Sequence, residues 1–257
     1  MASLEITSEH KKRINRAILH IEAHLSDELT LDEVAEVACF SSYHFHRVFK
    51  AITSETLNAF VKRRRIEKSA SMLMRNFEME IGEVSAKLGF KSVSSFSRAF
   101  RQYYDVAPSA FRKLSPSKYS KISQIDRKNG QPSAIFEPYI CDMKNQIKWL
   151  EANAKIAVMD RPSMDLIRVN VIGLHRVSES FAQLQKWANP KGLLESDDVK
   201  AVIIYHDSLK VTAFDKARLS TCFTVKEKVE ASGEISLVSI EAGRQIVASM
   251  EIVMEEF

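Results

Sequence analysis

The most constraining feature of this sequence is a short stretch that occurs twice. Residues 31–50 read LDEVAEVACFSSYHFHRVFK, and residues 81–101 read IGEVSAKLGFKSVSSFSRAFR. The matching positions are Leu31/Ile81, Glu33/Glu83, Val34/Val84, Phe40/Phe90, Phe45/Phe96, Arg47/Arg98 and Phe49/Phe100. An internal repeat indicates a duplicated supersecondary unit. Each copy is typical of a short helix, a tight turn and a second helix, so the sequence predicts two helix-turn-helix units, at about 29–50 and 79–102.

Capping residues indicate where the helices of the repeat begin. Thr30 and Glu33 form a capping box, and a Ser at 41 or 42 can cap the next helix. Ser92 can do the same in the second copy, where Gly89 can supply a left-handed turn. A helix over about 56–75 is expected to join the units. At ~1.5 Å per residue it spans ~30 Å, close to the ~34–36 Å between successive major grooves on one face of DNA.

Length and composition limit the class of protein. A chain of 257 residues, 45% of them apolar, can form two folded domains. The cysteines, Cys39, Cys141 and Cys222, are too dispersed for a disulfide framework or a four-thiolate zinc site, which favours a reducing, cytoplasmic location. No 18-residue apolar run and no signal peptide are visible. We therefore expect no membrane segment, no metal and no cofactor.

The net positive charge is confined to the part of the chain that contains the repeat and the segment after it. Residues 1–115 carry 18 Lys and Arg against 14 Asp and Glu, and residues 116–128 carry 4 against 1. Residues 129–257 carry 15 against 18. A polyanion is the natural partner of such a half, although an ordinary solvated surface would have the same charge.

Three stretches of the sequence resemble a known protein family. The stretches LTLDEVAEVACFSSYHFHRVFK, RRRIEKSA and EVSAKLGFKSVSSFSRAFRQYYDVAPSAFRK are similar to the DNA-binding domain of AraC/XylS-type bacterial transcription regulators, over about residues 8–113. The resemblance implies two recognition helices that enter adjacent major grooves of double-stranded DNA, with RNA polymerase as a further partner. Glu80 and Ala107 depart from the family pattern, which would weaken helix capping by ~0.5–1 kcal/mol.

The helical faces and the resemblance together predict the residues that contact DNA. The predicted base-contacting residues are Tyr43, His46, Arg47, Val93, Ser94, Ser97 and Arg98. The predicted phosphate-contacting residues are Ser42, Lys50, Lys91, Ser92, Ser95 and Arg101. We expect Arg47 and Arg98 to carry most of the hydrogen-bonded readout, since arginine can bond guanine at O6 and N7. The alternative for each is a salt bridge to a neighbouring helix. The run Lys62–Arg65 is expected to meet phosphates or carboxylates, with part of it paired to acidic side chains.

The C-terminal half has a different pattern. Residues 115–135 have the composition of a linker. Strands are predicted at 164–173, 201–205, 218–225 and 234–240, and a helix at 178–188. The order is β-α-β-β, so the fold class is multidomain: an all-α double helix-turn-helix domain (8–114), the linker, and an α+β domain (136–257).

This half resembles the gyrase-inhibitor-like (GyrI-like) effector-binding domain. Residues 166–225, with IYHD at 204–207 and CFTV at 222–225, carry the resemblance. It implies a small amphipathic or cationic effector bound in a cleft between two β-α-β-β units. The apolar residues we place near that cleft are Phe181, Trp187, Tyr205 and Phe223, which in the alternative interpretation belong to the core.

A weak second repeat matches residues 171–181 to residues 247–257. It predicts a strand at about 244–250 and an effector-binding domain that is incomplete in this chain, with pairing of two chains as one consequence. His175, His206 and Asp207 are interpreted as surface and turn residues and not as a catalytic site.

Three classes of function compete. A sequence-specific transcription regulator, not an enzyme, is favoured by the two helix-turn-helix units and the basic charge. A small-molecule-binding or hydrolytic GyrI-like protein is the second class. A nonspecific architectural DNA-binding protein is the third, and a comparison of specific with random DNA distinguishes it from the first.

Overall fold

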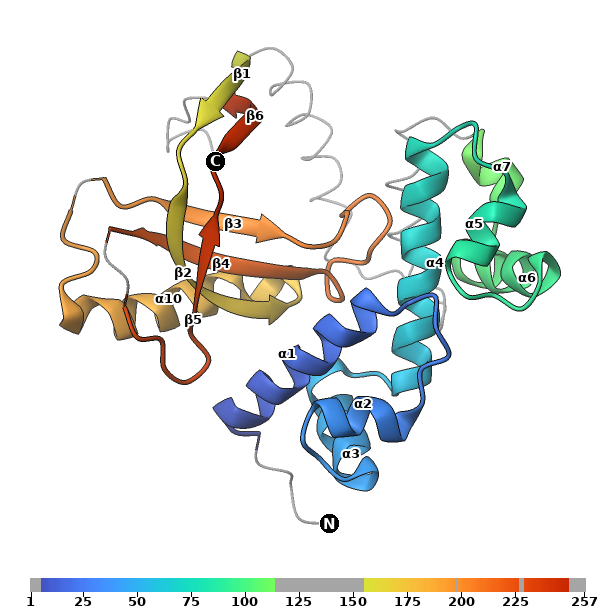
Figure 1. Ribbon diagram of the computed structural model, residues 1–257, viewed down its shortest axis with the longest axis horizontal. Helices are drawn as coiled ribbons and strands as arrows, with labels where there is room; N and C mark the ends of the chain where they lie inside the picture. The colour runs from blue at the N-terminus through green and yellow to red at the C-terminus, as the bar shows by residue number, and fades with distance from the viewer. Residues whose placement is uncertain (1–5, 114–154, 197, 227–228, 250–257) are drawn as a thin grey trace.

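The chain forms a helical part and a β-sheet part that contact each other (Figure 1). The structure, a computed structural model, describes residues 6–113, 155–196, 198–226 and 229–249. The predicted linker, 115–135, lies outside the described residues.

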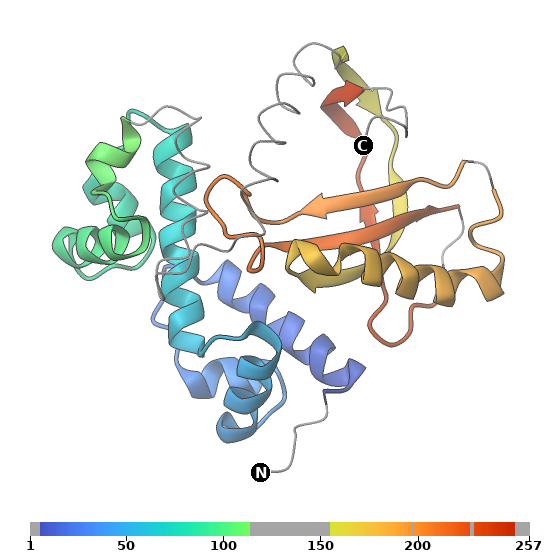
Figure 2. The same cartoon turned by 180° about the vertical axis from the view of Figure 1, so that it is seen from behind.

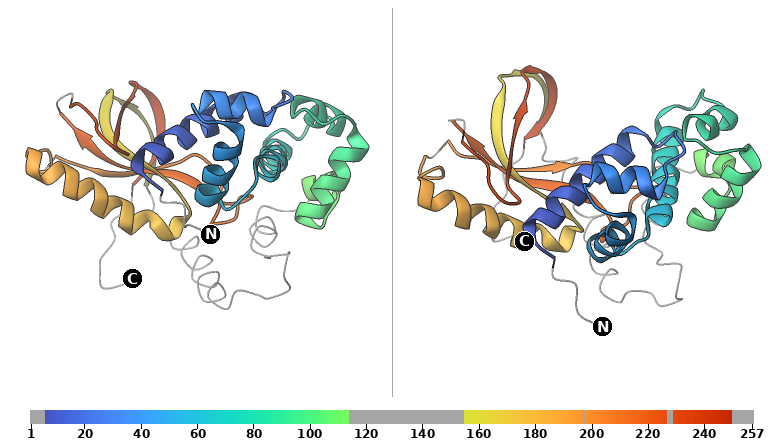
Figure 3. Two further views of the ribbon diagram at one scale, coloured as in Figure 1. Left: turned by 90° about the horizontal axis from the view of Figure 1, so that it is seen from below. Right: turned by 60° about the horizontal axis from the view of Figure 1, so that its bottom comes forward.

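Within residues 6–113, seven helices make up the helical part. They are α1 (Ser8–Ala23), α2 (Leu31–Val37), α3 (Ser42–Thr53), α4 (Leu57–Arg75), α5 (Ile81–Lys87), α6 (Val93–Tyr104) and α7 (Pro108–Arg112). Helices α1 to α3 surround one end of the long helix α4, and α5 to α7 surround the other end (Figures 1 and 2). Figure 3, in its left panel, views α4 nearly along its axis. The two helix-turn-helix units, α2–α3 and α5–α6, agree with the prediction from the repeat.

Each unit has its own aromatic core, built from two phenylalanines of the repeat and one from a neighbouring helix. In the first unit the ring of Phe49 lies 5.1 Å from that of Phe45 and 5.3 Å from that of Phe60. In the second unit Phe100 lies 5.6 Å from Phe96 and 5.1 Å from Phe111. All of these side chains are at most 1% exposed. Because burial of one such ring stabilises by ~1.5–3 kcal/mol, the two cores hold each unit together separately.

Serine hydroxyls cap both second helices of the repeat. The Ser41 hydroxyl accepts a hydrogen bond from the backbone N–H of His44, at 3.4 Å. In the second unit the Ser92 hydroxyl accepts from the N–H of Ser95 at 3.1 Å, and the Ser95 hydroxyl accepts from the N–H of Ser92 at 3.3 Å. These caps fix the start of α3 and α6, where the predicted DNA contacts begin.

The structure shows one of the two hydrogen bonds of the capping box predicted at Thr30. The Thr30 hydroxyl accepts from the N–H of Glu33 at 3.2 Å, while the Glu33 carboxylate contacts the ring of His20, also at 3.2 Å. In the second unit the Glu83 carboxylate accepts from the N–H of Glu80 at 3.2 Å. A carboxylate at this position is also favourable for the helix dipole, which compensates for the missing hydroxyl.

The turns of the two units use different residues in the same backbone conformation. Gly89 has φ of 68°, as its position after α5 requires, and its counterpart Cys39 has φ of 56°. A Cβ at Gly89 would lie 2.2 Å from the carbonyl oxygen of Ser26, so this position also needs the absence of a side chain. The backbone of the second turn therefore packs directly on the segment that follows α1.

The sheet part has six strands and one α-helix in its described residues. They are β1 (Lys155–Arg161), β2 (Met164–Ile172), α10 (Val177–Ala188), β3 (Ala201–Tyr205), β4 (Arg218–Val225), β5 (Ser236–Ile240) and β6 (Gly243–Ser249), with 3-10 turns at Leu174–Arg176 and Asn189–Lys191. Strands β3-β4-β2-β5 form an antiparallel sheet, and β1 pairs with β6 in a separate two-stranded ribbon. The predicted strands and helix of the C-terminal half are confirmed, and β1 was not predicted.

Helix α10 covers one face of the four-stranded sheet (Figures 1 and 2). Alternate residues of β2, Ile167, Val169 and Val171, pack in the same buried cluster as Leu184 and Ala188 of α10. The residues between them face the other side, which is open to α1 near the end of β2. The last residue of β2, Ile172, packs on the core of the first helix-turn-helix unit.

Gly89→Ala should lower the free energy of unfolding of the full chain by about 1–3 kcal/mol, because φ is positive and the new Cβ would meet a backbone oxygen. The control is Gly82→Ala within α5, where the nearest atom to a new Cβ is 3.8 Å away. That change should stabilise by up to ~1 kcal/mol. Urea unfolding followed by circular dichroism measures both. Equal effects of the two variants would contradict this account of the turn.

Candidate nucleic-acid interface

Helix α3 exposes the side chains that the sequence predicted to contact bases. Tyr43 is 75% exposed, and His46 and Arg47 are also exposed. The guanidinium carbon of Arg47 lies 5.8 Å from the centre of the Tyr43 ring, a cation–π contact that groups the two side chains. Lys50 is exposed one turn further along the helix.

Helix α6 exposes the corresponding side chains of the second unit. Val93 is 46% exposed, Ser94 and Arg98 are exposed, and Ser97 is half-buried. The Arg98 side chain makes one long hydrogen bond, from Nε to the carbonyl of Ser94 at 3.4 Å. The second helix of each unit, α3 and α6, therefore presents an exposed arginine, as the repeat predicted.

In the part of the chain that the structure describes, the exposed cations on and beside these helices have no carboxylate partner. Among the described residues, no ion pair is found for Arg47, Lys50, Lys91, Arg98 or Arg101. The alternative of a salt bridge to a neighbouring helix is thus absent from this structure for Arg47 and Arg98. Exposed cations that lack a carboxylate partner among the described residues suit a polyanion.

The predicted serine contacts are engaged within the protein. The Ser42 hydroxyl donates to the carboxylate of Asp32. Ser92 and Ser95 cap their own helix, and the Ser95 hydroxyl also donates to the carbonyl of Ser92 at 2.8 Å. Backbone N–H groups at the start of α6 are used by these caps, so the roles of the serines at phosphates stay predictions.

The cationic run of α4 lies largely inside the protein. Arg63 is held by Glu55 and Glu67, at 2.8 and 2.9 Å, and Arg64 reaches Glu67 at 2.6 Å. The Tyr103 hydroxyl donates to the same Glu67 carboxylate at 2.9 Å. The expected pairing of part of the run with acidic residues is confirmed, and Arg63 and Arg64 are not available to phosphates.

Arg65 joins the two units through backbone carbonyls. It donates to Leu25, Asp27 and Gly89, at 2.7, 2.6 and 3.1 Å. Burial lowers the pKa of Arg65, which the charge of Asp27 partly offsets. Lys62 reaches the side-chain oxygen of Gln102 at 3.2 Å. The side chains of Lys62–Arg65 therefore serve mainly to position the two helix-turn-helix units.

A buried carboxylate of the sheet part, Asp207, is bonded to the helical part. Its Oδ1 lies 2.6 Å from Nη2 of Arg64 and 2.7 Å from Nη2 of Arg218. Glu22 of α1 contacts the same two arginines, at 2.6 and 3.2 Å. We call these four residues the junction. The Asp207 side chain is 0% exposed, so its interpretation as a surface turn residue was wrong.

The charges of the junction stabilise one another's ionised forms. Burial alone would raise the pKa of Asp207, but the hydrogen bond from Arg218 and the charges of Arg64 and Arg218 outweigh it and lower the pKa. Burial would likewise lower the pKa of Arg64, yet Glu22 and other carboxylates raise it. The contribution of Asp207 to stability is present in full above its ordinary pKa of 3.8 and is lost as the pH falls through the lowered value.

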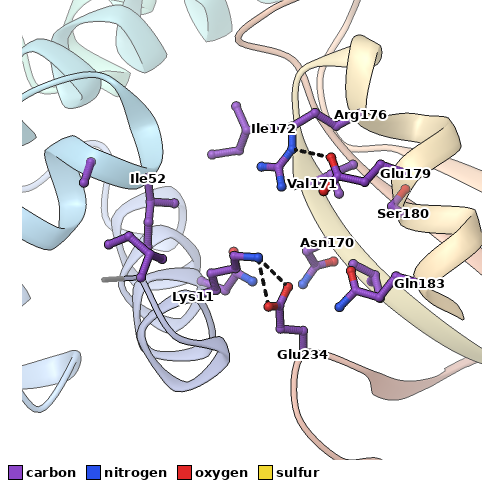
Figure 4. A pocket seen from close by; sticks show the side chains of 14 residues that line it. Lys11, Ile52, Asn170, Val171, Ile172, Arg176, Glu179, Ser180, Gln183 and Glu234 are labelled. Carbon is purple, nitrogen blue, oxygen red and sulfur yellow. Dashed lines mark hydrogen bonds and ion pairs between the residues drawn. The ribbon is translucent and has the colours of Figure 1, made fainter. Parts of the chain in front are cut away.

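Two adjoining cavities separate α1 from the sheet. One, of about 270 Å³, is lined by Leu19 of α1, by Arg168 and by Arg218 among others. The other, of about 210 Å³, is shown in Figure 4, where the Lys11 ammonium pairs with Glu234 at 2.9 Å. Both are lined by Asn15, Asn170, Val171 and Ile172, so together they form what we call the interdomain groove.

The aromatic residues predicted for an effector pocket lie away from this groove. Phe181 and Phe223 pack against each other at 5.4 Å in the cluster between α10 and the sheet. The Trp187 indole donates to the Ser232 hydroxyl at 2.9 Å, and Tyr205 is 51% exposed. None of these four residues lines either cavity of the groove. Their role in effector binding stays a prediction.

A serine and a histidine meet beside the groove. His206 lies 2.7 Å from the Ser220 hydroxyl, which in turn donates to the Asn170 side chain at 2.6 Å. Burial lowers the pKa of His206, as do the charges of Arg218 and Arg168. Because Ser220 is fully buried and gives its proton to Asn170, this is not the arrangement of an activated nucleophile.

Within the described ranges, no group of three or more His, Cys, Asp or Glu could hold a metal. In the same residues, no helix is long and apolar enough to cross a membrane. The Cys222 thiol has its pKa raised to about 11, chiefly by burial.

Comparison with known proteins places the helical part in the helix-turn-helix class. A family model described as a helix-turn-helix domain matches residues 34–114. The regulatory protein SoxS of Escherichia coli (strain K12) is 33% identical over 103 residues, which are 40% of this chain and 95% of SoxS. The regulatory protein PocR of Salmonella typhimurium is 38% identical over 103 residues, and this chain covers only 34% of its length.

The chain therefore belongs to the AraC family of helix-turn-helix regulators, and it is a sequence-specific DNA-binding transcriptional regulator. Among solved structures, the C-terminal domain of AraT, a response regulator from Geobacillus stearothermophilus, is 29% identical. That match covers 40% of this chain and 88% of the other, with a TM-score of 0.38.

Proposed function

We propose that the regulator reads two adjacent major grooves with α3 and α6. Arg47 and Arg98 bond base edges, and Lys50, Lys91 and Arg101 contact phosphates. The observation that carries this assignment is the absence, among the described residues, of any carboxylate paired with these exposed cations. Tyr43, His46, Val93, Ser94 and Ser97 complete the base-contacting surface, and Ser42, Ser92 and Ser95 the phosphate-contacting one.

The proposed roles separate cleanly in a binding experiment. The target site is first obtained by selection from random duplexes. Arg98→Ala should then cost about 1–3 kcal/mol at that site and relax base preference at one or two positions. Lys91→Ala should weaken binding to all duplexes alike and reduce the salt slope by about one.

Fluorescence anisotropy on the selected and a scrambled duplex measures both variants. An equal loss on both duplexes for Arg98→Ala would remove its role in base readout. An absence of any preference in the unmodified chain would instead favour the nonspecific architectural class.

We further propose that the sheet part, within the domain limits 136–257, is a GyrI-like effector-binding domain that follows the DNA-binding domain (8–114). The element order β2-α10-β3-β4 supports it. The interdomain groove is the effector site that the described residues favour. It combines apolar residues such as Leu19, which is 63% exposed, with Arg168, for which no carboxylate partner is found among the described residues. An amphipathic small molecule with an acidic group suits this lining.

The groove can be probed with anilinonaphthalene sulfonate, an amphipathic anion that fluoresces when bound to apolar surface. Arg168→Met should weaken its binding about tenfold, since a hydrogen bond to a charged group is worth ~1.5–3 kcal/mol. The matched control, Lys50→Met on the DNA-reading helix, should bind the probe normally. Unchanged binding by Arg168→Met would place the anion elsewhere.

RNA polymerase is a further proposed partner, as expected of a transcription regulator of this family. We also propose that two chains associate through the β1–β6 ribbon. Ile156, Val158 and Ile246 lie on one face of it, with Val158 paired to Ile246, and are 72%, 63% and 79% exposed. An apolar strand face of this kind favours association with a second copy.

Light scattering on the full chain should give the mass of a dimer, and Val158→Lys should shift it to a monomer. Met159→Lys is the control, because Met159 lies on the opposite face of the same strand and is 49% exposed. A monomeric unmodified chain, or the same shift in both variants, would remove the ribbon from the proposed interface.

A further inference from the structure

One loop of the sheet part contacts both helix-turn-helix units. It is the β3–β4 loop, residues 206–217, which reaches α4 in both Figure 1 and Figure 2. Val211 and Thr212, in the middle of the loop, are 2% and 1% exposed. A loop that is buried in this way is part of the packing of the helical part and not a solvated connection.

The loop is bonded to the C-terminal ends of both reading helices. The Lys216 ammonium donates to the carbonyl of Thr53, the last residue of α3, at 3.3 Å. The hydroxyl of Tyr104, the last residue of α6, donates to the carbonyl of Val211 at 2.9 Å. An ammonium at the C-terminal end of a helix is favourable for the helix dipole as well.

The same loop is also bonded to α4. Asp207 pairs with Arg64 at 2.6 Å, near the middle of the helix that joins the units. Val211 belongs to the apolar cluster of the second unit, together with Phe100 and Tyr104. The loop thus holds α3, α4 and α6 at once.

We infer that the β3–β4 loop sets the separation of the two reading helices, with Lys216 and Asp207 as positioning residues and Tyr104 as their counterpart on α6. The inference rests on the proposed two-groove reading and deepens it. The predicted base contacts lie in the N-terminal halves of α3 and α6, while the loop holds the C-terminal ends. Small rotations of either helix about α4 would change the distance between Arg47 and Arg98, and the loop resists them.

The consequence is selectivity for the spacing of the two half-sites. DNA fixes successive major grooves on one face ~34–36 Å apart. A rigid pair of reading helices fits only one spacing, whereas a loosened pair adapts to neighbouring spacings. The contacts of the loop therefore affect the recognition of spacing without affecting the recognition of bases in either half-site.

The test uses the full chain with Lys216→Met and Tyr104→Phe, singly and combined. Each removes one polar contact with little change in volume. Lys210→Met is the matched control, because Lys210 is an exposed residue of the same loop. Affinities are measured for the selected duplex, for duplexes with one base pair inserted or removed between the half-sites, and for each half-site alone.

The ratio of affinities for correct and altered spacing should fall about 5- to 10-fold in the double variant, as expected for the loss of two hydrogen bonds. Half-site affinities should stay unchanged, and the control should match the unmodified chain. A double variant that keeps the full ratio would overturn the inference.

An equal loss on every duplex would also overturn it, since the loop would then have a merely structural role. If the unmodified chain itself shows no dependence on spacing, the proposed two-groove reading fails first.

Discussion

The buried side chain of Asp207 can remain ionised only because the guanidinium groups of Arg64 and Arg218 contact it. Burying an ion without compensation costs several kcal/mol. Asp207 accepts two side-chain hydrogen bonds from Arg218, and it pairs with Arg64 of α4 at 2.6 Å. Apolar contacts such as that of Ile172 would tolerate a small sliding of the sheet on the helices. The charge-assisted contacts that cross between the parts, Arg64 with Asp207 at 2.6 Å and Arg218 with Glu22 at 3.2 Å, are directional and do not. The junction therefore specifies one orientation of the two parts, and the loop that carries Asp207 is placed between the units as a result.

The two units show how a duplicated sequence adapts to two surroundings. At the turn, the first unit keeps Cys39 at φ of 56°, while the second has Gly89 at 68°. A side chain is tolerated at Cys39 because that residue is exposed, and its carbonyl accepts a hydrogen bond from Arg13. Gly89 instead meets the carbonyl of Ser26, where no Cβ fits. The positive φ is common to the fold of the unit, whereas the need for glycine arises from the contact between units.

The sequence predicted those helices and strands in which apolar residues recur at the spacing of the buried positions. The strands at 201–205 and 218–225 were found at their observed limits, and both helix-turn-helix units followed from the repeat. Strand β1 was missed because its residues are almost all exposed, so no alternation of buried and exposed positions marks it. The burial of Asp207 could not be inferred, since its partner Arg64 is distant in sequence and no local pattern links them. Interactions between parts of the chain, and the groove they form, require the structure.

Net charge predicted a polyanion partner for the helical part but does not by itself identify which cations are available to that partner. The densest cationic run is Lys62–Arg65, yet Arg63 and Arg64 are paired with a buried carboxylate, and the guanidinium of Arg65 is engaged by backbone carbonyls. Arg47 and Arg98 stand alone in the sequence and keep their charge available at the surface. Counterion release depends on the cations that reach phosphates and not on their total number. The proposed DNA-binding surface therefore rests on two conditions together: the cations are exposed without a carboxylate partner among the described residues, and they recur on α3 and α6 of both repeat units.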